Sequence, residues 1–407
     1  MSRLDDQTRS QYRALGLSTV AFTVCFAVWT IFSIIGVALK DQLGLSETQF
    51  GLLIGTPVLT GSLVRIVLGI WTDRYGGRLV YTLTMLAAAV ATSLLVFAQT
   101  YEQFLVAALG VGFAGGSFAV GVAYVSRFYP QSKQGTALGI FGVGNVGAAV
   151  TKFVAPFVMV AFGWQAVALG WAGALAVMAV VFWFTTEDDP VLIKRRKEGA
   201  PQRSFLAEFA PLRDVRVWRF GLYYFFSFGA FVALTLWLPR YLIGVYGFDI
   251  KMAGMIAAAY SIPASLFRAY GGTLSDKVGA RLIMYWTFGV SAVVTLLLSL
   301  PAGLITPLLF IALVFVLGFF MSLGKAAVYK HIPTYYPDNV GAVGGLVGMI
   351  GGIGGFILPL LFGWLKDATG MWSSCFLALF VLVLVSLGLM HLAVRRMATR
   401  QGASQPA

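Results

Sequence analysis

The chain has 407 residues, of which 59% are hydrophobic and only 11% are charged. A soluble domain has about 25% charged residues, so this composition excludes a soluble enzyme of this length. The formal net charge of +13 would suggest nucleic-acid binding in a soluble protein. Here we expect it to reflect basic loops on one side of a membrane, and we expect no nucleic-acid partner.

Long apolar segments follow one another along the whole chain. Each can cross a bilayer core of roughly 30 Å as a helix, and the short alternating segments of a β-barrel do not occur. The predicted fold class is therefore an all-α polytopic membrane protein with twelve transmembrane helices in two pseudo-symmetric six-helix halves. The spans are placed at residues 15–39, 47–71, 79–99, 102–128, 134–161, 164–185, 217–239, 251–274, 281–301, 305–329, 341–365 and 371–393.

The only long polar connection divides the spans into six and six. We therefore expect an N-terminal half at 1–186, a central cytoplasmic loop at 187–216, and a C-terminal half with a short cytoplasmic tail at 217–407. The first residues carry charges of both signs and no cleavage site for a signal peptide. Basic residues gather in the connections on one side, which predicts cytoplasmic N- and C-termini in a bacterial inner membrane. Cys25 and Cys375 lie inside spans, so no disulfide framework is expected.

Two arginines, Arg65 and Arg268, lie near the middle of spans two and eight within nearly the same sequence. The first copy reads SLVRIVLGIWTDRYGGRLV (Ser62–Val80), and the second reads SLFRAYGGTLSDKVGARLI (Ser265–Ile283), with Arg268 following Arg65 by 203 residues. An arginine at the bilayer centre costs about 3 kcal/mol even on insertion scales. A duplicated buried arginine therefore needs a physical reason.

The carboxylates do not supply that reason. All 16 acidic residues lie at span ends or in loops, and Asp73 is about 12 Å from Arg65 along a helix. Arginine keeps its charge at physiological pH, and its fork suits planar oxyanions. The pair therefore predicts an anionic substrate, with bonding of each arginine to backbone carbonyls as the alternative.

Spans five and eleven are rich in glycine, which permits close helix packing and favours a small cavity. They begin YPQSKQGTALGIFGVGNVG (Tyr129–Gly147) and YPDNVGAVGGLVGMIGGIGG (Tyr336–Gly355). Asn145, in the middle of span five, needs a polar partner at membrane depth. That partner is either the substrate or a neighbouring helix.

The duplicated segments resemble the loop 2–3 and loop 8–9 motifs of the major facilitator superfamily, over the whole chain. The two glycine-rich stretches, the first followed by Ala155-Pro156, are similar to the paired signatures of its nitrate/nitrite porter (NarK/NasA) family. The superfamily resemblance implies that two motif loops latch the cytoplasmic side. The residues so implied are Gly69, Asp73, Arg74, Gly76, Arg78, Gly272, Asp276, Lys277, Gly279 and Arg281.

The family resemblance also implies the residues that bind the substrate. Arg65 and Arg268 would clamp the anion, Asn145 would contact it, and Phe118 of span four would stack on it. The span-seven tyrosine corresponds to Tyr224, with Phe228 one turn on, or to its neighbour Tyr223. Many relatives have glutamine where this chain has Lys152, a departure that concerns the coupling mechanism.

Uphill import of an anion needs a coupling cation, commonly a proton. No carboxylate or histidine lies at the middle of a span, so Lys152 and Lys325 are the coupling candidates. A desolvated lysine can titrate in a working range. Lys152 is preferred, either as the proton carrier or as a residue that shapes the electric field of the site.

The predicted function is nitrate import by alternating access, with nitrate/H⁺ symport as the leading mechanism. The alternatives are nitrate/nitrite antiport, an anion channel, and a signalling receptor that retains a transporter fold. We expect a monomer in the lipid bilayer that binds nitrate, and nitrite as a further substrate. The sequence carries no metal-ligand spacing, cofactor motif or nucleophile constellation, so no cofactor and no enzymatic activity are predicted.

Overall fold

The computed structural model describes residues 2–188, 190, 193, 210–336 and 340–402. Within this part of the chain, 12 helical stretches are long and apolar enough to cross a membrane, and no β-strand occurs. The predicted all-α fold with twelve spans is therefore confirmed. Most of the predicted central loop, residues 194–209, lies outside the described residues.

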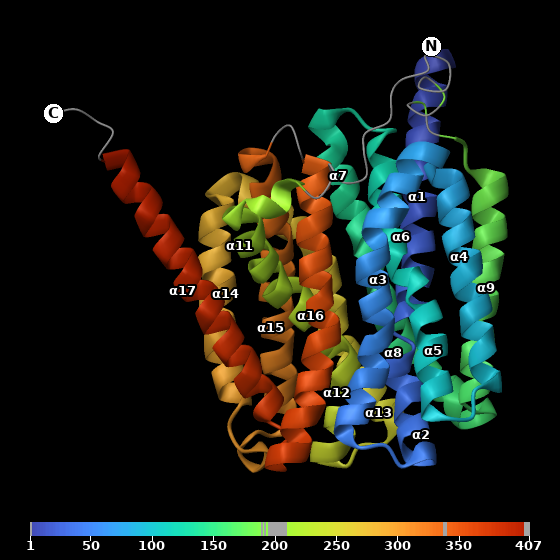
Figure 1. Ribbon diagram of the computed structural model, residues 1–407, viewed down its shortest axis with the longest axis vertical. Helices are drawn as coiled ribbons and strands as arrows, with labels where there is room; N and C mark the ends of the chain where they lie inside the picture. Colours follow the sequence, from blue (N-terminus) through green and yellow to red (C-terminus); the bar gives the residue numbers. More distant parts are fainter. Residues whose placement is uncertain (1, 189, 191–192, 194–209, 337–339, 403–407) are drawn as a thin grey trace.

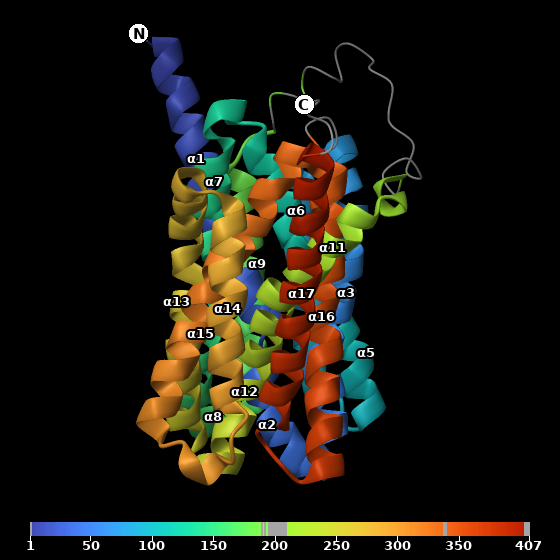
Figure 2. The ribbon, with the colours of Figure 1, turned by 90° about the vertical axis from the view of Figure 1, so that its left-hand side faces the viewer.

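The helices run along one common direction, and the start of α1 and the end of α17 lie at the same end of the bundle (Figures 1 and 2). We call this end the terminal face and the other end the opposite face. The first six spans comprise α1 (Ser2–Trp29) with α2 (Phe32–Leu43), α3 (Glu47–Tyr75), α4 (Gly77–Leu94), α5 (Tyr101–Val111) with α6 (Phe113–Ser126), α7 (Gln131–Gly142) with α8 (Gly147–Phe162), and α9 (Trp164–Thr185).

Among the described residues, one of the second six spans is broken into two helices and five are continuous, whereas three of the first six are broken. Figure 1 shows α17 tilting away from the rest of the bundle toward the terminal face. These spans comprise α11 (Val215–Tyr224) with α12 (Phe231–Tyr246), α13 (Ile250–Val278), α14 (Ala280–Leu298), α15 (Pro307–Tyr335), α16 (Val340–Thr369) and α17 (Ser374–Gly402).

Two spans change their helical geometry near the membrane centre. A 3₁₀ turn at Val143–Val146 joins α7 to α8, and a π-helical segment at Phe225–Ala230 joins α11 to α12. Such local changes re-aim side chains and are frequent at functional sites. The first contains Asn145 and the second contains Phe228, so two of the predicted site residues lie on altered backbone.

The two groups of six spans are tightly joined at the opposite face. A Cβ at Gly51 of α3 would overlap the carbonyl oxygen of Pro359 in α16. Arg240 of α12 donates from Nε to Glu47 of α3 at 3.1 Å. Asp367 of α16 accepts a hydrogen bond from the backbone N–H of Thr48 at 2.7 Å. Close backbone packing, an ion pair and a helix cap together close this face.

The contacts differ toward the terminal face. Gly345 of α16, and the motif glycines Gly69 and Gly272, have no atom within 4 Å of an added Cβ. The motif aspartates form their ion pairs inside their own group of spans. The bundle is therefore closed at the opposite face and looser toward the termini.

Candidate functional site

Arg65 lies near the middle of α3 and is only 4% exposed. Its guanidinium donates from Nε to the carbonyl of Gly115 at 3.4 Å and from Nη1 to that of Gly348 at 3.2 Å. Gly115 belongs to α6 and Gly348 to α16, so this side chain links helices of both groups. The carbonyl-bonded alternative therefore holds for part of Arg65, but carbonyls do not neutralise its charge.

Arg268 lies at the corresponding position of α13 and is 8% exposed. Its Nη1 is buried and has no hydrogen-bond partner among the described residues. An unmade hydrogen bond on a buried donor costs about 1–3 kcal/mol, and more on a charged group. Arg268 therefore carries a buried, charged donor that no described residue satisfies.

One aromatic ring brings the two arginines together. The Cζ atoms of Arg65 and Arg268 each lie 5.5 Å from the centre of the Phe118 ring, on α6. Phe118 is held in turn by Phe141 of α7, whose ring is stacked at a centroid distance of 5.8 Å. A ring face stabilises a nearby cation by about 0.5–2 kcal/mol, which offsets part of the burial cost.

A second aromatic group borders Arg65 from the C-terminal spans. The Phe228 ring lies 5.3 Å from the Cζ of Arg65, and Tyr224 stacks on Phe228 at 5.0 Å. Tyr223 instead packs edge-on against Phe288 at 5.6 Å. Of the two tyrosines left open by the sequence, Tyr224 is the one that lies in this group.

Sequence reasoning missed two aromatic residues of the cluster. The Tyr329 ring of α15 lies 5.7 Å from the Cζ of Arg268 and 4.9 Å from the ring of Tyr224. The Trp29 ring of α1 lies 5.6 Å from the Cζ of Arg65. No periodicity or spacing in the sequence distinguishes Tyr329 or Trp29 from the other aromatic residues of the chain.

Asn145 is 1% exposed, and neither its Oδ1 nor its Nδ2 has a hydrogen-bond partner within the described part of the chain. Three residues earlier, Gly142 lies so near Arg268 that an added Cβ would be 3.4 Å from its Cδ. Because a 3₁₀ turn repeats every three residues, Asn145 follows Gly142 on the same face. The interhelical hydrogen bond considered for Asn145 is not formed in this conformation.

Glycines of α16 let its backbone approach Arg65. A Cβ at Gly348 would lie 2.7 Å from the Tyr329 hydroxyl, and one at Gly352 would lie 3.4 Å from Arg65 Nη1. Gly142 has the equivalent relation to Arg268 from span five. The two glycine-rich stretches therefore each face one arginine, which leaves little room for a large ligand.

Comparisons with known proteins show the family to which the chain belongs. The Major Facilitator Superfamily model matches residues 17–304 and 246–407. A probable nitrate/nitrite antiporter NarK1 of Thermus thermophilus is 44% identical, covering 97% of this chain and 94% of the relative. A nitrite extrusion protein of Bacillus subtilis is 30% identical over 92% of this chain and 93% of the relative. This chain belongs to the nitrate/nitrite porter family of the major facilitator superfamily.

More distant comparisons agree on the fold of this porter. A probable nitrate transporter NarT of Staphylococcus epidermidis is 27% identical over 95% of the chain and 97% of the relative. The solved structure of a bacterial homologue of the human lysosomal transporter Spinster, inward-facing and unoccupied, matches with a TM-score of 0.76 at 16% identity. That match covers 95% of this chain and 97% of the other, and it shows the shared fold alone.

The two lysines considered for coupling are both fully buried in the porter. Lys325 of α15 donates to the carbonyl of Ala264 at 2.5 Å, and its Nζ lies 3.5 Å from the centre of the Phe231 ring. Ala264 precedes Arg268 by one helical turn, so Lys325 lies beside the arginine cluster. Lys152 of α8 lies farther away, between the two groups of spans.

The motif loops lie at the terminal face, apart from the cluster. Asp73 pairs with Arg127, and Asp276 pairs with Lys330. Arg78 donates to the carbonyl of Trp183 at 2.6 Å. Each of these interactions stays within one group of six spans.

The remaining motif residues have simple local roles. Gly76 and Gly279 adopt φ values of 95° and 91°, conformations that favour glycine, where α3 and α13 end. Arg74, Lys277 and Arg281 are exposed at the same level. Their arrangement leaves them free to form other contacts in another conformation.

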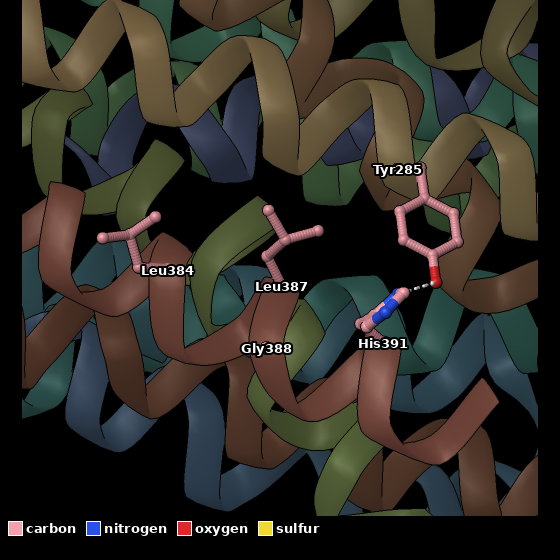
Figure 3. A pocket seen from close by; sticks show the side chains of 5 residues that line it. All are labelled: Tyr285, Leu384, Leu387, Gly388 and His391. Carbon is pink, nitrogen blue, oxygen red and sulfur yellow. Dashed lines mark hydrogen bonds between the residues drawn. The ribbon is translucent and has the colours of Figure 1, made fainter. Parts of the chain in front are cut away.

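A separate cavity of about 440 Å³ lies between α14 and α17 (Figure 3). It is lined by Tyr285, Leu384, Leu387, Gly388 and His391, and the Tyr285 hydroxyl lies 3.1 Å from His391 Nδ1. Its lining contains no arginine or lysine. This cavity therefore has none of the chemistry of the arginine cluster.

Proposed function

We propose that this chain imports nitrate across the bacterial inner membrane as a secondary active transporter, by alternating access between residues 1–186 and 217–407. The observation that carries the proposal is the pair Arg65 and Arg268 over one ring, with Arg268 Nη1 unpartnered. An anion bound there would supply both the missing charge and the missing hydrogen bond. The names of the relatives from Thermus and Staphylococcus support nitrate as that anion.

The site suits a small, flat anion. A guanidinium can donate two parallel hydrogen bonds to an oxyanion. Part of this fork in Arg65 already serves backbone carbonyls, and Phe118 offers a ring face to both arginines. The glycines Gly142 and Gly352 bring backbone close to the arginine side chains. Nitrate is planar and small and carries one charge, so it fits this chemistry, and nitrite shares most of it.

The basic connections support a cytoplasmic terminal face, with both termini inside. On this orientation the conformation is closed to the outside and approached from the cytoplasm. Alternating access would then require the outer seal at Glu47 and Arg240 to open while the motif loops at Asp73–Arg78 and Asp276–Arg281 latch the inner side. We propose that one chain, acting as a monomer, is the transporting unit.

We propose Lys325 as the residue that takes up the coupled proton. Arg268 is its near neighbour, and its hydrogen-bond acceptor is the neutral carbonyl of Ala264. A positive charge on Lys325 is therefore opposed by Arg268 and assisted by an anion bound there. Anion and proton would bind together, which is the thermodynamic requirement for symport. From the sequence we preferred Lys152 for this role, but Lys152 does not lie beside Arg268 as Lys325 does.

Nitrate/nitrite antiport is the second candidate. The name of the relative from Thermus thermophilus, a probable nitrate/nitrite antiporter 44% identical to this chain, supports it. In antiport, nitrite would bind the same two arginines after nitrate is released inside, and it would be carried outward. No residue would then need to carry a proton.

Proteoliposome flux of labelled nitrate distinguishes these mechanisms. Uptake is measured with an imposed pH gradient, with internal nitrite, or with neither, and Arg268→Gln is the inactive control. We expect the pH gradient to drive accumulation, and Lys325→Gln to abolish that accumulation while nitrate binding persists. Accumulation driven only by internal nitrite would favour antiport, and conductance without saturation would identify a channel.

A further inference from the structure

Lys152 forms a hydrogen bond across the boundary between the two groups of spans. Its Nζ on α8 donates to the Ser261 hydroxyl on α13 at 2.8 Å and to the Ala148 carbonyl at 3.3 Å. The residue is 0% exposed. Both acceptors are neutral, and an ammonium group has three hydrogens to donate. The environment therefore solvates this cation only weakly.

This hydrogen bond lies nearer to the opposite face of the bundle than the arginine cluster does. Lys152 follows Asn145 by seven residues along span five, and Ser261 precedes Arg268 by the same number in α13. Seven residues of α-helix span about 10 Å. The two helices touch at this level, because a Cβ at Gly254 would overlap the backbone carbonyl of Lys152.

Two other cations toward the opposite face share a carboxylate partner. Arg240 pairs with Glu47, and Lys40 lies 3.5 Å from the same carboxylate. Within the described residues Lys152 has no carboxylate within ion-pair distance, and hydroxyl and carbonyl acceptors leave its charge uncompensated. An anion would be a better partner than either, but the closed helices exclude it in this conformation.

We propose that Lys152 is an outer anion-binding station, which holds the incoming anion before it reaches the arginines. When α8 and α13 separate, the Ser261 hydroxyl moves away with α13 and the ammonium is left facing the outer opening. The anion then takes its place, and on closure Ser261 restores the bond as the anion passes inward. This inference rests on the proposed direction of transport.

The chemistry of lysine suits a site that attracts anions without distinguishing between them. Its ammonium is a compact point charge on a flexible stem and lacks the planar fork of arginine. It would attract small anions by charge, while the two arginines distinguish them by shape. Removal of Lys152 should therefore change how anions arrive from outside and leave their selection unchanged.

The test compares the two sides of the membrane in proteoliposomes of known orientation. For Lys152→Gln we expect the KM for nitrate from the outer side to rise about tenfold, the size of a typical electrostatic steering effect. The KM from the cytoplasmic side should stay unchanged, and Lys152→Arg should restore the outer value. Lys366→Gln removes another lysine of the opposite face, outside this boundary, and should behave as wild type.

Accessibility gives an independent readout. A cysteine at position 152, in Lys152→Cys, should react with a membrane-impermeant thiol reagent from the outer solution and be protected when the outer face is closed. Failure to react would overturn the station, as would equal changes of KM on both sides, or loss of proton-driven uptake at unchanged KM. Wild-type protein that takes up no nitrate would instead overturn the proposed function, because the thiol reaction does not depend on transport.

Discussion

Arg65 and Arg268 occupy equivalent positions in a duplicated segment, yet their surroundings differ. Arg65 donates to two backbone carbonyls, whereas Arg268 Nη1 has no partner in the described structure. The duplication has kept the cation in each copy but not the groups that solvate it. Under the proposed function, Arg65 is held by carbonyls before the anion binds, and Arg268 keeps a free donor for the anion.

The difference arises from how the glycine-rich helices meet each arginine. Gly348 of α16 presents its carbonyl oxygen to Arg65. Gly142 of α7 instead presents its Cα side to Arg268, where an added Cβ would lie 3.4 Å from Cδ. The glycine-rich stretch of span eleven thus provides a carbonyl acceptor for Arg65. The stretch of span five only lets the backbone come close to Arg268.

The largest expected effect is that of Arg268→Lys. The change keeps the charge but removes the fork, and each lost hydrogen bond to a charged group costs about 1.5–3 kcal/mol. We expect nitrate affinity, measured by titration calorimetry, to fall about 100-fold. Arg65→Lys should cost only about tenfold, because part of its fork already serves carbonyls. Equal losses would contradict the asymmetry.

Asn145→Ala should have the next largest effect. Its Nδ2 is a buried donor without a partner among the described residues, so we assign the hydrogen bond of this amide nitrogen to the anion, which accepts it. We expect about a tenfold loss of nitrate affinity, the value of one hydrogen bond to a charged group. Thermal unfolding of the ligand-free variant should be unchanged, since no bond is broken there. A destabilised variant with normal affinity would show a purely structural role.

A smaller effect is expected from Gly348→Ala. The added methyl would lie 2.7 Å from the Tyr329 hydroxyl, which donates to the Gly344 carbonyl at 3.0 Å. Displacing this tyrosine should weaken nitrate binding several-fold through its packing against Arg268. Gly345→Ala is the matched control, because an added Cβ there meets no atom within 4 Å. Identical affinities for the two variants would exclude a role for Tyr329.

The smallest effects are expected at the motif loops. Asp73 pairs with Arg127, whose side chain is only 10% exposed, whereas Asp276 pairs with Lys330, which is 49% exposed. Asp73→Asn removes a carboxylate partner from a nearly buried cation, so it should reduce the nitrate uptake rate more than Asp276→Asn. Exposed pairs contribute little, so we expect less than about a threefold change for Asp276→Asn. The reverse order in a flux assay would contradict this difference.

Much of this arrangement follows from the sequence, because it depends on composition and on repetition. Span length and hydropathy predict the twelve helices. The sequence repeat identifies Arg65 and Arg268, and the positions of the acidic residues show that neither arginine has a carboxylate nearby. The resemblance to the porter family adds Phe118, Tyr224 and Phe228, which lie beside them. These features are local or repeated, so they can be read along the chain.

The rest depends on contacts between distant helices. Trp29 and Tyr329 join the cluster from spans one and ten, and aromatic residues are too numerous in this chain for a pattern to single them out. The choice between the two tyrosines is made by ring contacts, since Tyr224 stacks on Phe228 and Tyr223 packs against Phe288 of α14. The bond from Lys152 to Ser261 depends on which face of the bundle is closed, a property of the conformation and not of the sequence.

The central claim is that one planar anion lies between the two guanidinium groups. A structure of the protein determined with and without nitrate tests this most directly. The account predicts planar density between Arg65 and Arg268, beside Phe118, with an oxygen within hydrogen-bond distance of Arg268 Nη1. Nitrate bound elsewhere, with Arg268 Nη1 still unpartnered, would contradict it.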